Sequence, residues 1–273
     1  DEIAWSIVAV PSKKWAAKVF PHLKEEEQVP ALWDAIFKAV RIGEGDVVAL
    51  WREHISNLES RAKLLNEKQY VRLHYKAPGT DLQIELPKGH IWQSGASKTP
   101  DGTSFVANMP TEEVFTLPSK YGVNGYVRNT KPLVYHGNVI DNFTLTFKEG
   151  KIVEAHAETC EFLLQDLINT DEGSAYLGEV ALVPHESPIS SSNILYFNTL
   201  FDENASNHLA VGAAYPTCFE GGRELSEEQL EEKGINVSVT HEDFMIGSEE
   251  MDIDAVLQDG TVEPLFRRGN WAF

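Results

Sequence analysis

An imidazole and a carboxylate stand two residues apart in the segment from Val237 to Phe244, as His241 and Asp243. In a β-strand, side chains two residues apart point to the same face, roughly 7 Å from one another along the strand. A histidine and an aspartate placed in this way can bind one metal ion or one of a pair. A surface His–Asp pair on a half-exposed strand would show the same pattern, so this segment alone leaves both interpretations open.

A second segment, from Asp202 to Tyr215, contains another histidine and a tyrosine. We expect a helix over residues 202–214, in which His208 and Tyr215 are separated by two turns and therefore share a face. An imidazole beside a phenol could supply a metal ligand and a hydrogen-bond donor to an oxyanion. An ordinary packed helix face is the alternative interpretation.

Isolated glutamates in apolar surroundings are the third feature. Glu179 falls within the apolar stretch from Tyr176 to Val183, which we expect to be a buried strand. An unpaired carboxylate is costly there, so Glu179 needs a cation or a buried salt bridge. Glu112 and Glu113 are adjacent and would point to opposite faces of a strand, so at most one of them can bind a given metal. A solvated loop is the alternative for this pair.

Taken together, these segments supply two histidines and three carboxylates, enough for a site that holds two metals through nitrogen and oxygen ligands. Such a ligand set suits zinc, cobalt or manganese. A site of this kind polarises a carbonyl group and produces a metal-bound hydroxide near neutral pH. The sequence contains no HExxH motif, no CxxC pair, no GxSxG motif and no glycine-rich phosphate loop.

The composition narrows the classes of partner. The 273 residues include 42 acidic and 23 basic side chains, for a net charge of −19. This charge would repel a nucleic-acid backbone or an anionic membrane surface, so we expect neither as a partner. The apolar runs are far shorter than the ~20 residues of a membrane span. The sequence has two cysteines, Cys160 and Cys218, which fit a reducing, cytoplasmic setting. We expect no secretory signal, since no basic segment followed by an apolar one opens the sequence.

The first 69 residues are predicted to be mainly helical. A short apolar run, Ile3 to Val10, suggests a buried strand that ends at Pro11. Apolar residues with helical spacing follow Glu25 and continue to Val40, and a second helix begins after Asp46, which is a suitable N-cap. His54 lies on the apolar face of that second helix, and we expect it to be structural.

From Tyr70 the hydrophobic period changes from 3.6 to 2 residues. The alternation predicts one hairpin over residues 70–86 and a second over residues 143–157. A short helix is expected over residues 161–168, followed by strands over residues 176–183, 235–246 and 253–257. The predicted fold is therefore α+β: a strand-rich mixed domain with a few helices, preceded by a helical segment.

At these segments the sequence strongly resembles the thermophilic-type metallo-aminopeptidases, the family of aminopeptidase T, aminopeptidase S and PepS. The resemblance is closest to the PepS branch of Gram-positive bacteria and extends over nearly the whole chain. The matching stretches are residues 74–86, Asn108 to Thr116, Gly178 to Val183, Asn198 to Ser206 with His208, and His241 to Met245.

The resemblance implies a role for each matching residue. Glu179 is implied to be shared between two metals, and the remaining implied ligands are Glu113, His208, His241 and Asp243. Tyr215 is implied to steady the tetrahedral oxyanion. Glu112 is the candidate general base, by analogy with other two-metal aminopeptidases.

The implied function is a metallo-aminopeptidase that releases N-terminal residues from peptides through a hydroxide bridging two divalent metals (zinc, cobalt or manganese). Its substrates would be peptides with a free N-terminus, and the full-length protein would be a homodimer. Residues 1–69 would be the C-terminal portion of an N-terminal α/β domain that is otherwise missing, and residues 70–273 the catalytic domain. A non-catalytic, metal-stabilised dimerisation or scaffold fragment and a two-metal carboxypeptidase or other amidohydrolase are the alternatives.

Overall fold

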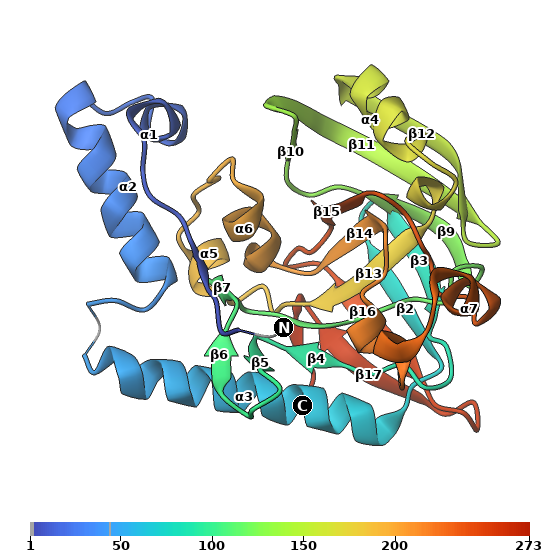
Figure 1. Cartoon of the computed structure of the whole chain (residues 1–273). Helices are drawn as coiled ribbons and strands as arrows, with labels where there is room; N and C mark the ends of the chain where they lie inside the picture. Colours follow the sequence, from blue (N-terminus) through green and yellow to red (C-terminus); the bar gives the residue numbers. More distant parts are fainter. Residues whose placement is uncertain (1–2, 44) are drawn as a thin grey trace.

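Two antiparallel sheets dominate the computed structural model, which describes residues 3–43 and 45–273 (Figure 1). The larger sheet contains nine strands: β2 (Arg72–Ala77), β3 (Thr80–Glu85), β9 (Val123–Arg128), β10 (Leu133–Tyr135), β11 (Asn138–Lys148), β12 (Lys151–Thr159), β16 (Asp252–Val256), β17 (Val262–Arg267) and β18 (Asn270–Trp271). The smaller sheet has the strand order β15 (His241–Met245), β14 (His208–Gly212), β13 (Leu177–Leu182), β8 (Val114–Thr116), β4 (Gln93–Ser94). The predicted strand-rich α+β class is confirmed.

Shorter elements connect and cover these sheets. Two small sheets pair β1 (Ile7–Val8) with β7 (Asn108–Met109) and β5 (Ala96–Lys98) with β6 (Ser104–Val106). The α-helices are α1 (Lys13–Val19), α2 (Glu25–Ala39), α3 (Val47–Lys68), α4 (Glu161–Ile168), α5 (Pro188–Ser191), α6 (Thr199–Asp202) and α7 (Glu227–Glu232). The 3-10 turns are η1 (Gly173–Ala175), η2 (Glu203–Ala205), η3 (Pro216–Cys218) and η4 (Gly222–Glu224). None of the described helices is long and apolar enough to cross a membrane.

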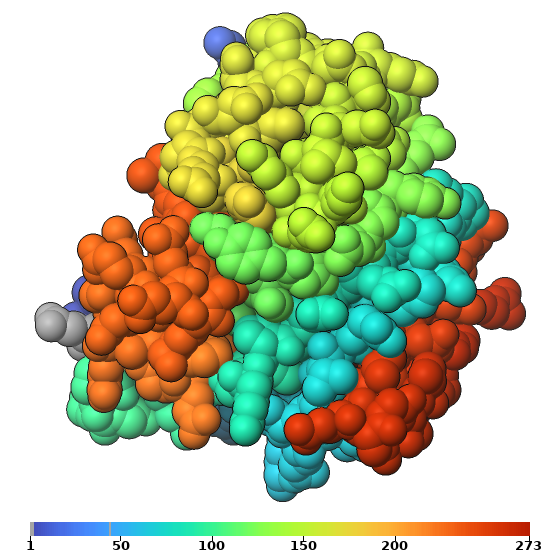
Figure 2. All heavy atoms as spheres, turned by 90° about the vertical axis from the view of Figure 1, so that its right-hand side faces the viewer, coloured from blue at the N-terminus to red at the C-terminus, as the bar shows by residue number. Residues whose placement is uncertain are grey.

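The two predicted hairpins are present, because alternating apolar residues give each strand one buried face. In β3, Leu82 and Ile84 are fully buried, while the residues that alternate with them, Asp81, Gln83 and Glu85, are exposed. In the second hairpin, β11 pairs with β12 and α4 packs on the pair. Figure 2 shows this hairpin and α4 at one end of the molecule, in yellow and green, and the C-terminal strands in red at the other.

The N-terminal helices pack in two different places. Asp46 caps α3 as predicted, since its Oδ1 accepts hydrogen bonds from the backbone N–H groups of Val48 and Ala49 at 3.1 Å each. Buried side chains of α3 join the main core between the sheets. Helices α1 and α2 instead form a separate core with α5, α6 and η2, which lie between them and the sheets (Figure 1).

Three local predictions were wrong. The expected buried strand over residues 3–10 is the two-residue β1, which pairs only with β7 at its edge, so Ile7 and Val8 remain exposed. The strand expected from Ile235 covers only His241–Met245. The helix expected over residues 202–214 ends in η2, and His208–Gly212 forms β14 instead.

Strand β14 lies between β13 and β15 in the sheet, and all five of its residues are buried, so both of its faces are covered. A central strand of this kind shows a continuous apolar run, which periodicity alone does not distinguish from a helix. The glycine at its end, Gly212, allows close approach of the neighbouring segment. A Cβ atom at Gly212 would lie 2.2 Å from the carbonyl oxygen of Thr240, and Gly212 also has a φ of +99°.

Candidate metal centre

The register of the five-stranded sheet brings the candidate ligands to one face. Glu179 of β13 lies opposite Ala210 of β14, and Ala210 lies opposite Asp243 of β15. His208 and His241 are each two residues from this row, so their side chains point to the same face. Glu113 directly precedes β8, which pairs with β13 on the other side. Side chains from four strands or strand ends therefore meet over Ala210.

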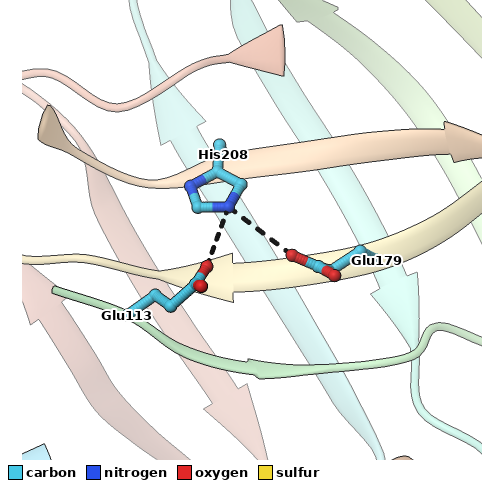
Figure 3. A group of neighbouring side chains, drawn as sticks. All are labelled: Glu113, Glu179 and His208. Atoms are coloured by element: carbon cyan, nitrogen blue, oxygen red, sulfur yellow. Dashed lines mark ion pairs between the residues drawn. The ribbon is translucent and has the colours of Figure 1, made fainter. Parts of the chain in front are cut away.

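His208 lies at the centre of the first group of ligands (Figure 3). Its Nε2 is 3.1 Å from Oε2 of Glu113 and 3.5 Å from Oε1 of Glu179. The imidazole and both carboxylates are almost fully buried. Three side chains that are far apart in the sequence thus present one nitrogen and two oxygen donors to the same small volume.

His241 forms the second group with the other oxygen of Glu179. Its Nε2 is 3.7 Å from Oε2 of Glu179 and 3.6 Å from Oδ1 of Asp243. Its Nδ1 is 2.7 Å from the carbonyl oxygen of Ala213, to which it can donate a hydrogen bond. This contact fixes the orientation of the ring and leaves Nε2 directed at the carboxylates, as is common for metal-binding histidines.

Both groups have the composition of a cation site. Glu113, Glu179 and His208 offer donor atoms within 4.8 Å of one another, as do Glu179, His241 and Asp243. Glu179 belongs to both sets, one carboxylate oxygen lying near each histidine. Two buried polar atoms, Nδ1 of His208 and Oδ1 of Asp243, have no hydrogen-bond partner among the described residues. The mixed nitrogen and oxygen donors fit divalent cations such as zinc, cobalt or manganese.

The electrostatics of the cluster follow from burying several carboxylates together. Burial raises the pKa of Glu179, and the negative charges of Asp243 and Glu113 raise it further. Burial alone would lower the pKa of His208, but its contacts with Glu113 and Glu179 raise it well above the ordinary value. For His241 the contact with Asp243 likewise outweighs burial and raises the pKa to about 9. The cluster therefore favours positive charge at its centre.

A cavity of about 500 Å³ opens over these ligands. Tyr215 lines it and is 45% exposed, with its ring centroid 4.6 Å from that of His241. Because Tyr215 follows β14 rather than lying on a helix, the predicted two-turn relationship with His208 is wrong. Both side chains nevertheless line the same cavity.

Glu203 of η2 was not among the predicted site residues, yet it lines this cavity and is only 9% exposed. Its Oε1 accepts a hydrogen bond from Nδ2 of Asn204 at 3.2 Å. Burial raises its pKa well above the ordinary value. The only available signal was its place in the stretch Asn198 to Ser206, one of those that resemble the family.

Glu112 points away from the cluster, as expected for the neighbour of Glu113. Its two carboxylate oxygens accept hydrogen bonds from the guanidinium of Arg41 at 2.5 and 2.8 Å. It is absent from the described residues that line the cavity. The predicted role of Glu112 as general base does not fit this geometry, because the carboxylate is bound on both oxygens and faces Arg41.

His54 is part of the same network and has the structural role predicted for it. Its Nε2 is 2.7 Å from the carbonyl oxygen of Thr111, and its Nδ1 is 3.2 Å from Arg41. Burial lowers its pKa, so the neutral ring can donate to Thr111 and accept from Arg41.

Comparison with known proteins places these observations in a family. Residues 1–271 match the family described as thermophilic metalloprotease (M29). The chain is 56% identical over 273 residues to Aminopeptidase AmpS of Bacillus subtilis (strain 168), covering 100% of this chain and 67% of that protein. It is 50% identical over 272 residues to Aminopeptidase PepS of Streptococcus thermophilus, covering 99% of this chain and 66% of that protein.

A solved structure agrees with these matches. Wild-type AmpT from Thermus thermophilus superimposes with a TM-score of 0.91 at 45% identity, covering 98% of this chain and 65% of that chain. The chain thus spans about two thirds of the length of the relatives that it matches.

Proposed function

Because the chain belongs to the thermophilic metalloprotease (M29) family, we propose that it is a metal-dependent aminopeptidase that releases N-terminal residues from peptides. The observation that carries the proposal is the position of Glu179 between His208 and His241, with Glu113 and Asp243 completing two groups of donor atoms. The relatives named as aminopeptidases support it.

In this proposal Glu113, Glu179 and His208 hold one divalent cation, and Glu179, His241 and Asp243 hold a second. Bound cations would supply a Lewis acid for the scissile carbonyl and would lower the pKa of the attacking water. The five-stranded sheet keeps the five side chains in place, because β8, β13 and β14 each pair with a strand on both sides and the edge strand β15 pairs with β14.

Two further side chains are proposed to act on the substrate. The phenol of Tyr215 donates a hydrogen bond to the carbonyl oxygen as negative charge develops on it. Glu203, rather than Glu112, transfers the proton in this proposal, since it is a cavity-lining carboxyl group that belongs to neither group of ligands. The acidic lining also attracts the positively charged amine of a peptide N-terminus.

Other properties implied by the family resemblance stay predictions. These are the presence of two metals, their identity as zinc, cobalt or manganese, the homodimer, the cytoplasmic location and the domain boundary at residue 69. The packing of the N-terminal helices bears on this boundary. Helix α3 packs in the same core as the sheets, whereas α1 and α2 pack on α5 and α6.

The test is hydrolysis of aminoacyl p-nitroanilides before and after treatment with a chelator, followed by addition of zinc, cobalt or manganese. We expect activity that the chelator removes and that a divalent metal restores. Peptides with an acetylated N-terminus should not be cleaved, whereas a carboxypeptidase would accept them. Metal binding without turnover of any free-amine substrate would favour the non-catalytic alternative instead.

A further inference from the structure

The Arg41–Glu112 ion pair lies directly beside the candidate metal centre and is not used by the proposed reaction. Arg41 follows α2, in the connection to α3, whereas Glu112 immediately precedes the candidate ligand Glu113. The two side chains are 14% and 5% exposed. A buried, doubly hydrogen-bonded pair of this kind holds its two backbone segments in a fixed relationship.

Arg41 is itself held from several sides. Its guanidinium contacts Nδ1 of His54 at 3.2 Å and lies 5.8 Å from the centroid of the Trp51 ring. The indole N–H of Trp51 donates to the carbonyl oxygen of Val40, the residue before Arg41. The backbone of Arg41 has a φ of +60°, which residues other than glycine seldom adopt. The surrounding contacts therefore maintain a conformation that the local sequence does not favour.

The network continues from Glu112 into the cavity along two routes. One is the chain itself, since Glu113 is the next residue and its Oε2 lies 3.1 Å from His208. The other begins at the backbone N–H of Glu112, which donates to Oδ1 of the fully buried Asn204 at 2.7 Å. Nδ2 of Asn204 in turn donates to Oε1 of Glu203.

We infer that Arg41 and Glu112 are positioning residues that couple the N-terminal helical segment to the metal centre by fixing Glu113 directly and Glu203 through Asn204. Neither residue contacts the ligand atoms of the other strands, so their effect passes through Glu113 and Asn204. When a residue that orients a metal ligand is replaced, metal affinity typically falls about 10- to 100-fold. The inference rests on the proposed metal site.

The experiment compares Arg41→Met with Lys68→Met in the purified protein. Lys68 also forms a doubly hydrogen-bonded pair, with Glu263 at 2.7 and 2.8 Å, which is more exposed than the Arg41–Glu112 pair. Neither Lys68 nor Glu263 is among the described residues that line the cavity. Zinc affinity is measured by competition with a chromophoric chelator. The temperature is one at which circular dichroism shows that the metal-free proteins are folded. We expect Arg41→Met to weaken zinc binding at least tenfold, and Lys68→Met to leave it within twofold.

Two further variants separate positioning from general stability. Arg41→Lys keeps the charge but loses the paired hydrogen bonds, so it should restore only part of the zinc affinity. Glu112→Gln keeps the side-chain shape and should also weaken zinc binding. It tests the same ion pair if Arg41→Met does not fold. At saturating zinc, kcat should fall in Arg41→Met and in Glu112→Gln, while KM changes little. Folded Arg41→Met and Glu112→Gln proteins with the zinc affinity of the parent would overturn the inference. A parent protein that binds no zinc, cobalt or manganese would instead refute the proposed site itself.

Discussion

Glu179 and His208 lie on neighbouring antiparallel strands, with Oε1 of the glutamate 3.5 Å from Nε2 of the histidine. They are not directly opposite one another: Glu179 faces Ala210, and His208 faces Ala181. The two long side chains therefore meet diagonally across the sheet, over two alanines whose small side chains leave room for them. The other oxygen of Glu179 lies near His241, so this carboxylate connects both groups of ligands.

Replacing Glu179 should affect both groups at once. We expect Glu179→Gln to lose bound metal and to reduce kcat by roughly a thousandfold or more, because the amide carries no charge and offers a single oxygen. Metal content by elemental analysis and the hydrolysis rate would be measured together. Glu154→Gln, on the exposed side of β12, is the matched control. A near-normal rate for Glu179→Gln would show that the site is placed wrongly.

Ala210 provides a test of the space between the ligands. It lies between Glu179 and Asp243 in the register and is fully buried. We expect Ala210→Val to weaken metal binding at least tenfold, because the added methyl groups would enter the volume around which the donor atoms converge. Val211→Ile enlarges the next residue of the same strand, which faces the opposite side, and should preserve metal affinity. Equal metal affinity in both variants would contradict this arrangement.

Tyr215 should contribute to the rate without contributing to metal binding. We expect Tyr215→Phe to lower kcat by about 10²- to 10³-fold, the usual cost of removing one oxyanion donor. The metal content should be unchanged, because the phenol belongs to neither group of ligands. Tyr126→Phe, which alters an exposed tyrosine of β9, is the control. An unaltered kcat in Tyr215→Phe would remove the phenol from the mechanism.

Glu203 should behave differently from Glu179. If it transfers a proton, Glu203→Gln should lower kcat by about 10²- to 10⁴-fold while the protein retains its metal. Glu112→Gln should differ again, with weaker metal binding as its primary defect. If metal-loaded Glu203→Gln hydrolysed the substrate at the parental rate, Glu203 would not be the residue that transfers the proton.

His90 should make stability depend on pH. Burial lowers its pKa, and the residue is 3% exposed. In the unfolded chain His90 therefore binds a proton below about pH 6.5, whereas in the folded protein it stays neutral to a lower pH. Stability contributed in this way is present above pH 6.5 and decreases as the pH falls toward the folded-state pKa, by at most about 1.4 kcal/mol per pH unit.

Urea unfolding of the chelator-treated protein at about pH 7.5 and about pH 5.5 measures this effect. The loss of stability on acidification should be smaller in His90→Asn than in the parent. His156→Asn, which removes an exposed histidine of β12, should resemble the parent. The same acid-induced loss in His90→Asn as in the parent would show that another group is responsible.

The sequence by itself determined the elements whose pattern is local: the two hairpins, the capped helix α3, the helix α4 and the α+β class. Alternating burial, an N-cap carboxylate and turn residues act over a few positions, so each can be recognised without the rest of the chain. Residue patterns also made the segments around Glu113, Glu179, His208, His241 and Asp243 candidates, but the choice of these five as ligands came from their resemblance to a known family.

Only the tertiary structure decided how these residues meet. Strand β14 was expected to be helical because a fully buried central strand has no alternation, and pairing with β13 and β15 overrides its local preference. Glu112 and Glu113 are chemically identical neighbours, yet one faces Arg41 and the other His208. Glu203 enters the cavity through the turn at η2. These outcomes depend on which distant segments pack together, and that information is distributed over the whole chain.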